Sequence, residues 1–86
     1  MSSADALPAD PTPTRLDATG LTCPLPVLRA RKALRDVAPG GLLEVRATDP
    51  AALKDFPAFC DATGHTLVET RDDGAGVTAF VIRKAG

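Results

Sequence analysis

Two prolines separated by a single residue, in segment 23–26 (Cys-Pro-Leu-Pro), restrict the fold of this chain more than any other feature. Proline has no backbone N–H and clashes with the preceding turn, so a helix accepts it only in its first turn. We therefore expect a helix to begin just after Cys23, with Cys23 as N-cap and Pro24 as its first residue. The helix should continue to about Val37, where segment 39–41 (Pro-Gly-Gly) ends it.

The rest of the chain alternates between strand and helix patterns. Alternating apolar residues and β-branched residues predict strands at 14–18, 42–48, 66–71 and 77–83. Between the second and third strands, Asp49 and Pro50 open a short turn at 50–54. Asp55 is then expected to cap a second helix, which holds Pro57 in its first turn and ends at Gly64.

This order of elements, β-α-β-α-β-β, predicts an α+β fold. Two helices on one face of a four-stranded mixed sheet would bury both apolar stripes in a two-layer α/β sandwich. A right-handed crossover would join the first two strands in parallel, and the nearly continuous apolar last strand suits a central position. The 86 residues fit one domain, at 14–86, preceded by a flexible proline-containing tail at 1–13. So small a domain leaves little room for a deep substrate cavity.

Placement of Cys23 at the start of a helix predicts a reactive thiol. The helix N-terminus carries about half a positive charge, which favours the thiolate, and the thiolate is the nucleophilic form of cysteine. Because the prolines remove two backbone donors, the N–H groups of Leu25 and Val27 are those expected near the sulfur. The same prolines stiffen the turn and should hold the cysteine in few conformations.

The helix after Cys23 has a buried side and a basic side. At 100° per residue, one side gathers the apolar residues Val27, Ala30, Ala33, Leu34, Val37 and Ala38. The other side combines two apolar residues near the cysteine with four basic ones: Leu25, Leu28, Arg29, Arg31, Lys32 and Arg35. We interpret these six residues as a docking surface for acidic partner proteins, although a basic exposed side is ordinary in any helix.

Other candidate residues have structural interpretations. Cys60 shares a helical face with Phe56 and Phe59 and is expected in the core, where free cysteines are common. His65, the only histidine, is expected at a turn, and one His with two distant Cys does not match a zinc site. Segment 72–76 predicts a hairpin turn that includes Asp72, Asp73 and Gly74; like Gly40 and Gly41, its glycines lack a phosphate-loop pattern.

Composition argues against several classes of function. The net charge of −1 and the absence of Tyr and Trp argue against nucleic-acid binding, which commonly uses basic patches and aromatic platforms. No run approaches the ~20 apolar residues of a membrane span. The first residues lack the basic and apolar regions of a signal peptide, and two cysteines are too few for a disulfide framework. We therefore expect a monomer in the reducing cytoplasm, with both thiols free.

One stretch of the chain resembles the signature of the TusA/SirA family of sulfur carriers. It is segment 16–28, Leu-Asp-Ala-Thr-Gly-Leu-Thr-Cys-Pro-Leu-Pro-Val-Leu, in which Cys-Pro-x-Pro follows Leu-Asp-x-x-Gly-Leu. The similarity continues through residues 49–50, 55–60, 64–65 and 82–84, and so covers about residues 15–84. The family fold resembles the C-terminal domain of translation initiation factor three, a two-layer α/β sandwich, which agrees with the order of elements above.

The resemblance implies a role for each motif residue. Cys23 would accept a persulfide sulfur from a cysteine desulfurase or rhodanese-type donor and pass it to an acceptor such as a DsrE-type relay protein. Pro24 and Pro26 would be structural supports, while Asp17 and Gly20 would shape the loop that leads to Cys23. The sulfur would serve tRNA 2-thiouridine synthesis, although other family members serve molybdenum cofactor synthesis or sulfur oxidation. Apart from the transient persulfide, no cofactor or metal is expected.

Two other classes of function remain open from the sequence. A non-catalytic regulatory module could use the basic helix to bind RNA or a protein partner, and its binding would not depend on Cys23. A thiol-redox enzyme would need an external resolving thiol, because the chain lacks Cys-x-x-Cys. A relay carrier, by contrast, works best without a nearby second cysteine, since such a thiol would release the sulfur as sulfide.

Overall fold

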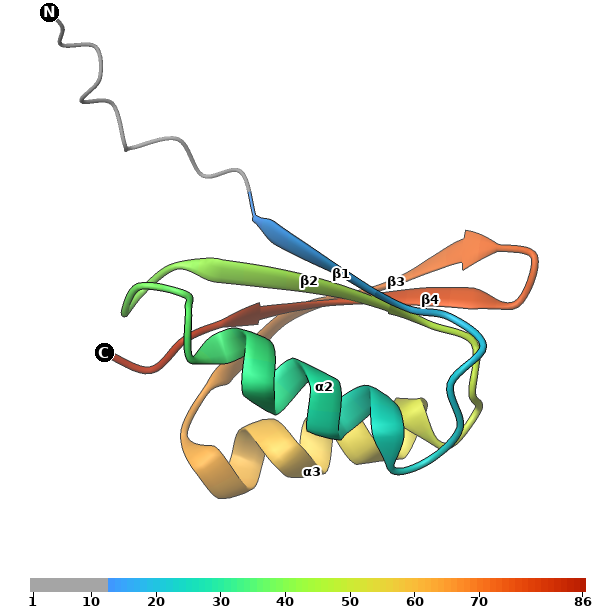
Figure 1. Cartoon of the computed structure of the whole chain (residues 1–86), viewed down its shortest axis with the longest axis horizontal. Helices are drawn as coiled ribbons and strands as arrows, with labels where there is room; N and C mark the ends of the chain where they lie inside the picture. Colours follow the sequence, from blue (N-terminus) through green and yellow to red (C-terminus); the bar gives the residue numbers. More distant parts are fainter. Residues whose placement is uncertain (1–12) are drawn as a thin grey trace, which may run out of the picture.

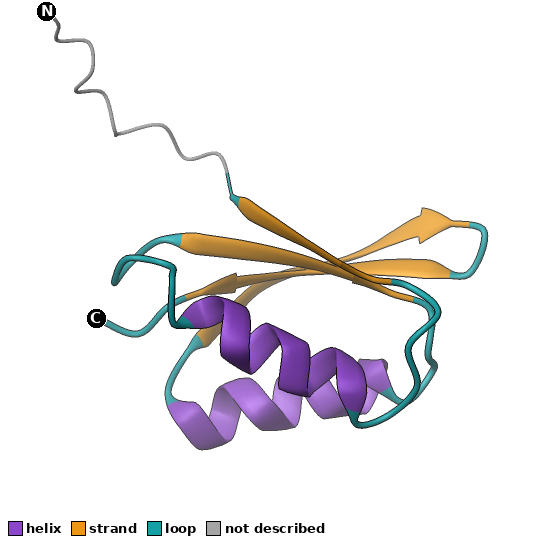
Figure 2. Ribbon diagram, viewed as in Figure 1, coloured by secondary structure: helices purple, strands orange, loops and turns teal. Residues whose placement is uncertain are grey.

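The computed structural model describes residues 13–86, so the predicted tail lies outside the described residues except for Pro13. The elements follow one another as β1 (Thr14–Ala18), α2 (Leu25–Leu34), β2 (Leu42–Ala47), α3 (Ala52–Thr63), β3 (Thr66–Gly74) and β4 (Val77–Arg83). The four strands form one sheet in the order β1-β2-β4-β3. Both helices lie on the same face of this sheet (Figures 1 and 2), which confirms the predicted α+β sandwich.

Strand directions follow from the connections. Strand β1 pairs with β2 in parallel, and helix α2 makes the crossover between them. Strand β4 lies between β2 and β3 and is antiparallel to both. Its predicted central position is therefore confirmed, and its apolar sequence is explained because a central strand has neighbours on both sides.

The core lies between the sheet and the two helices. Leu43 and Val45 of β2 face the helices with their β4 partners Ile82 and Phe80, as the period-two alternation of β2 predicts. From α3, Phe56 stacks on Phe80 with the ring centroids 4.5 Å apart. The buried set of the core comprises Ala18, Ala30, Leu34, Val37, Leu43, Val45, Ala47, Ala52, Phe56, Cys60, Phe80 and Ile82. These contacts hold both helices against the sheet.

Helix α2 is shorter than predicted at both ends. Pro24, and not Cys23, is the N-cap, so Cys23 lies one residue outside the helix. At the other end the helix stops at Leu34, and the backbone N–H groups of Arg35, Asp36 and Val37 bond three residues back rather than four. Such tighter bonds are a common way to satisfy the last carbonyls of a helix. Val37 is nevertheless buried, as its place on the apolar side predicts.

The prediction of a short turn followed by a second helix that begins at Asp55 is wrong. One helix runs from Ala52 to Thr63 with Pro57 inside it and Ala51 as N-cap, and it ends at Gly64, as predicted, with φ +83°. The turn over 49–52 leads directly into the helix. Pro57 removes only the backbone bond to Leu53, and both residues are exposed, so water can satisfy the free carbonyl.

The hairpin between β3 and β4 turns later than predicted. Strand β3 extends through Asp72 and Asp73 to Gly74, so neither aspartate is in the turn. The turn residues are Ala75 and Gly76, with φ values of +54° and +79°. Two positive φ angles are what a two-residue hairpin requires to match the twist of its strands. Both aspartates are therefore strand residues, and Asp73 forms ion pairs on the surface of the sheet.

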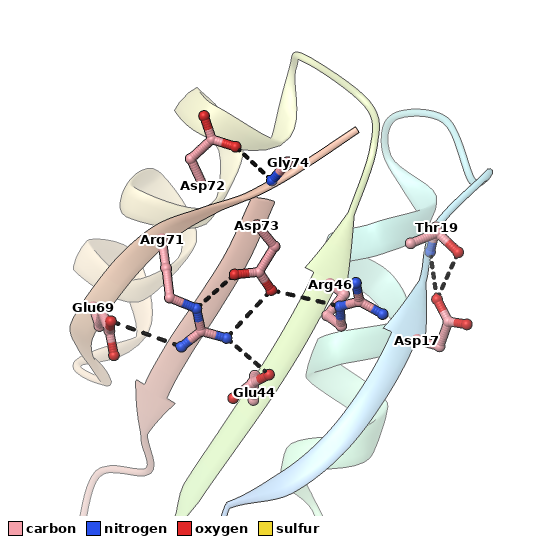
Figure 3. A network of polar contacts seen from close by, with 9 residues as sticks. All are labelled: Asp17, Thr19, Glu44, Arg46, Glu69, Arg71, Asp72, Asp73 and Gly74. Atoms are coloured by element: carbon pink, nitrogen blue, oxygen red, sulfur yellow. Dashed lines mark hydrogen bonds and ion pairs between the residues drawn. The ribbon is translucent and has the colours of Figure 1, made fainter. Parts of the chain in front are cut away.

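The face of the sheet away from the helices carries a network of charges, shown in Figure 3. The Arg71 guanidinium donates to Asp73 at 2.6 Å and to Glu44 at 3.2 Å, and it pairs with Glu69 at 3.7 Å. Arg46 pairs with Asp73 at 3.7 Å. This charge network lies beside Ala79 and Val81 of β4, which are buried although no helix covers them. Charges of both signs are paired here.

Candidate functional site

The loop that leads to Cys23 is held by a neighbouring loop. Strands β1 and β2 are parallel, so the loops that follow them leave the same end of the sheet, where both helices also begin (Figure 1). The Gly20 N–H donates to Thr48 Oγ1 at 2.8 Å and joins the two loops. Gly20 has φ +81°, a conformation that favours glycine. Asp17 Oδ1 accepts bonds from the Thr19 N–H and hydroxyl, which lower the pKa of Asp17.

Cys23 is exposed and lies between two carboxylates. Its backbone N–H donates to Asp49 Oδ2 at 2.7 Å, and its thiol donates from Sγ to Asp55 Oδ2 at 3.1 Å. Asp49 comes from the loop after β2, and Asp55 comes from the first turn of α3. Cys23 is therefore positioned by its own loop and by two other segments, the loop after β2 and the first turn of α3.

The electrostatics of this arrangement correct the prediction of a favoured thiolate. The hydrogen bond to Asp55 raises the pKa of the Cys23 thiol, and desolvation and the charges of Asp55 and Asp49 act in the same direction. A hydrogen bond to a carboxylate stabilises the protonated thiol, and nearby negative charge disfavours the thiolate. The Leu25 N–H, expected near the sulfur, instead donates to Thr22 O at 2.8 Å. The contact with Asp55 thus favours the protonated thiol of Cys23 at neutral pH.

An open hollow of ≈ 360 Å³ adjoins the sulfur. Its lining combines the cysteine with parts of both helices: Cys23, Pro24, Val27, Asp55, Ala58 and Phe59. Apart from Cys23 itself, Asp55 is the only member of this lining with an ionisable side chain. A second open hollow of ≈ 540 Å³ is lined by Pro50, Ala51, Leu53, Lys54 and Asp55. Asp55 therefore lines both hollows.

The predicted docking surface is exposed along α2. Leu25 and Leu28 keep 42% and 49% of their surface accessible, which is high for leucine. The four basic residues of this surface are also exposed: Arg29, Arg31, Lys32 and Arg35. Leu25 directly follows Pro24, and the peptide bond between Cys23 and Pro24 is cis. The role of this surface stays a prediction, but its accessibility is a property of the structure.

Cys60 and His65 occupy structural positions. Cys60 is buried in the core on α3, as predicted, and burial raises the pKa of its thiol. It forms no disulfide with Cys23. His65 lies between α3 and β3, where its Nδ1 accepts a bond from the Ala85 N–H at 2.9 Å. Within residues 13–86, no cluster of acidic, His and Cys side chains is arranged to hold a metal ion, and no helix is long and apolar enough to cross a membrane.

Sequence reasoning missed Asp49 and Asp55 as parts of the site. It placed Asp49 at the opening of a short turn and Asp55 at a helix start, where aspartate is common as a cap. One signal could have found Asp49: the predicted parallel pairing of the first two strands requires that the loops after them meet at one end of the sheet. Asp55 had no comparable signal, because its distance from Cys23 depends on how α3 packs against α2.

Comparison with known proteins places this chain in a family. The family described as sulfurtransferase TusA matches residues 14–84. A sulfur carrier protein TusA of Pseudomonas paraeruginosa is 51% identical over 74 residues, which cover 86% of this chain and 92% of that protein. The TusA of Allochromatium vinosum is 50% identical over 70 residues, covering 81% and 91% of the two chains. That of Pseudomonas fluorescens is 46% identical over 84 residues, covering 98% and 96%.

A solved structure shares the fold. The crystal structure of a SirA-like protein from Desulfitobacterium hafniense superposes with a TM-score of 0.74 at 26% identity, and the match covers 85% of this chain and 99% of that one. Together with the family match, this two-layer fold and its exposed thiol place the chain in the class of small sulfur carrier proteins. More specifically, the chain is a member of the TusA family of sulfur carrier proteins.

Proposed function

We propose that the chain carries sulfur as a persulfide on Cys23, which it accepts from a cysteine desulfurase or a rhodanese-type donor. The observation that carries this proposal is that Cys23 is the single exposed thiol of the chain, since the only other cysteine, Cys60, is buried. The open hollow beside the sulfur leaves the approach of a donor unobstructed. Because Cys60 is in the core, no second thiol is available to cleave the persulfide.

The transfer step is a thiol–disulfide type of exchange. Cys23 Sγ attacks the outer sulfur of the donor persulfide, a new S–S bond forms on Cys23, and the donor S–S bond breaks. The donor cysteine leaves as a thiolate and takes up the proton that Cys23 loses, so no oxidant or reductant is consumed. The acceptor repeats the step: its thiolate attacks the outer sulfur on Cys23 and regenerates the free carrier.

The acceptor that we propose is a DsrE-type relay protein, and the destination is the 2-thiouridine of tRNA. Membership of the TusA family supports a sulfur relay of this kind, and the exposed Leu25 and Leu28 beside the basic residues of α2 support contact with an acidic protein surface. The two free thiols fit the reducing cytoplasm. Direct binding of tRNA by this chain is not part of the proposal.

The test is to incubate the protein with a cysteine desulfurase and cysteine and to measure its intact mass. We expect a gain of one sulfur atom that a reductant removes. Cys23→Ser should abolish the gain, whereas the matched variant Cys60→Ala should retain it. Sulfur retained on Cys23→Ser would disprove the assignment.

A second experiment tests the destination. Deletion of the gene in its host should remove 2-thiouridine from tRNA, and the wild-type gene but not Cys23→Ser should restore it. Unchanged 2-thiouridine with a loss of molybdoenzyme activity or of sulfur oxidation would move the destination to one of those pathways. A tRNA gel shift that persists in Cys23→Ser would favour an RNA-binding module instead.

A further inference from the structure

Among residues 13–86, Asp55 is the one charged side chain that bonds to the Cys23 sulfur. Its Oδ2 accepts the thiol proton at 3.1 Å, while Asp49 Oδ2 accepts the Cys23 backbone N–H at 2.7 Å. An accepting carboxylate on the thiol and a second one on the backbone both favour the neutral cysteine. The arrangement is unusual for a nucleophilic cysteine, which is normally found next to cationic groups.

Cations of the chain do not offset these carboxylates. No salt bridge to Asp49 or Asp55 is present among residues 13–86, although Lys54 precedes Asp55 on α3. The influences that shift the pKa of Cys23 all raise it. The basic residues of α2 are exposed and contribute no opposing effect, and residues 1–12 contain no Lys, Arg or His.

We propose that Asp55 holds free Cys23 as a neutral, unreactive thiol, and that a donor protein activates the thiol by placing a cationic side chain against Asp55. This inference rests on the proposed function, since it specifies how the donor and the carrier meet. Asp55 acts through its contact with Sγ and is not the nucleophile. Its partner is identified by chemistry alone, as an Arg or Lys side chain on the donor surface.

The geometry explains how a cation would act. Asp55 lines both the hollow beside the sulfur and the second hollow at Leu53, so a side chain that enters from either hollow can reach its carboxylate. An Arg or Lys paired with Asp55 would compete for the oxygen that accepts the thiol proton and would cancel its charge. The thiol would then lose its proton to solvent more readily and Cys23 would attack as the thiolate; the donor cysteine, which leaves as a thiolate, would take up one proton afterwards, so the step balances.

The consequence is protection of the carrier between transfers. Oxidation and alkylation of a cysteine depend on its thiolate fraction and exposure. Cys23 is exposed, but only a small fraction of it would be the thiolate, so electrophiles and oxidants other than the donor should react with it slowly. Activation only inside the complex would reserve its reactivity for the correct donor.

The first arm of the test uses no partner protein. The rate of alkylation of Cys23 by iodoacetamide is measured against pH in the wild type, Asp55→Asn, Asp55→Glu and the matched control Asp61→Asn, which changes an exposed aspartate further along α3. In Asp55→Asn we expect a lower pH midpoint and a several-fold faster reaction near neutral pH. Its plateau rate at high pH should fall, because a less basic thiolate is a weaker nucleophile.

Two controls keep this arm decisive if Asp55→Asn is structurally damaged. Asp55→Glu retains the charge and should keep a midpoint close to that of the wild type. In the wild type itself, added salt should lower the midpoint only slightly, because a direct hydrogen bond from a half-buried carboxylate is screened weakly. A midpoint in Asp55→Asn equal to that of the wild type, or a wild-type midpoint that salt lowers as far as Asp55→Asn does, would overturn the first half of the proposal.

The second arm measures sulfur loading from a cysteine desulfurase at several carrier concentrations. Asp55→Asn should show a KM several-fold higher than that of the wild type or of Asp61→Asn, although its thiol is the more reactive one towards iodoacetamide. An unchanged KM would refute activation by a donor cation. If the wild type itself accepts no sulfur, the proposed function is wrong and so is the proposed activation by a donor cation. The alkylation profiles would still decide how Asp55 acts on Cys23.

Discussion

Replacement of Phe56 by alanine should be the most damaging single truncation in α3. Phe56 is fully buried, and its ring stacks on Phe80 of the central strand with centroids 4.5 Å apart. Truncation of a buried phenylalanine to alanine costs about 3–5 kcal/mol, through lost transfer free energy and the cavity that remains. Domains of this kind are stable by only about 5–15 kcal/mol, so the variant should lose a large share of its free energy of unfolding.

Urea denaturation followed by circular dichroism measures this loss. With an m-value of about 1–3 kcal/mol/M for a small protein, the midpoint should fall by ~1 M or more while the m-value stays the same. The matched control is Leu53→Ala on the same helix, where 56% of the residue is exposed and the expected change is within ~0.5 kcal/mol. A loss below ~1 kcal/mol in Phe56→Ala would refute the packing of α3 on β4 through this ring pair.

Two further predictions concern the docking surface and the charge network. Lys32→Glu should raise the KM for sulfur loading with only a small fall in melting temperature, because Lys32 is exposed although it lies in the last turn of α2, where a cation is favoured. Arg83→Glu, on β4, is the control, and equal effects of the two on KM would contradict a docking role for α2. The second prediction is a pH effect. The hydrogen bond from Arg71 lowers the pKa of Asp73 below its ordinary 3.8. The ion pair therefore stabilises the fold fully above pH 3.8, and this stabilisation is lost as the pH falls through the lowered pKa of Asp73. Asp73→Asn should therefore be less stable than the wild type near neutral pH in urea unfolding, and the difference should vanish in strong acid; a constant difference would exclude the ionised pair as its cause.

Local rules predicted most of the fold. The prolines at 24 and 26 locate the start of α2 within two residues, because their missing N–H groups exclude any earlier helical turn. Alternation in β2 predicts which of its residues face the core, since successive side chains point to opposite faces. The same rules failed at Pro57, where they predicted a helix break. Packing of Phe56 and Cys60 on the core holds one continuous helix across the single missing bond.

The amino-acid sequence by itself determined that Cys23 is the exposed thiol at the start of a helix and that Cys60 is a core residue, because both follow from patterns within one or two helical turns. Only the tertiary structure decided the chemical state of that thiol. Asp49 and Asp55 lie 26 and 32 residues from Cys23 along the chain, and they reach it because parallel strands end at the same edge of the sheet and α3 packs beside α2. A helix start favours a thiolate, but the Asp55 carboxylate that accepts the hydrogen bond from Sγ opposes it and raises the pKa of the Cys23 thiol.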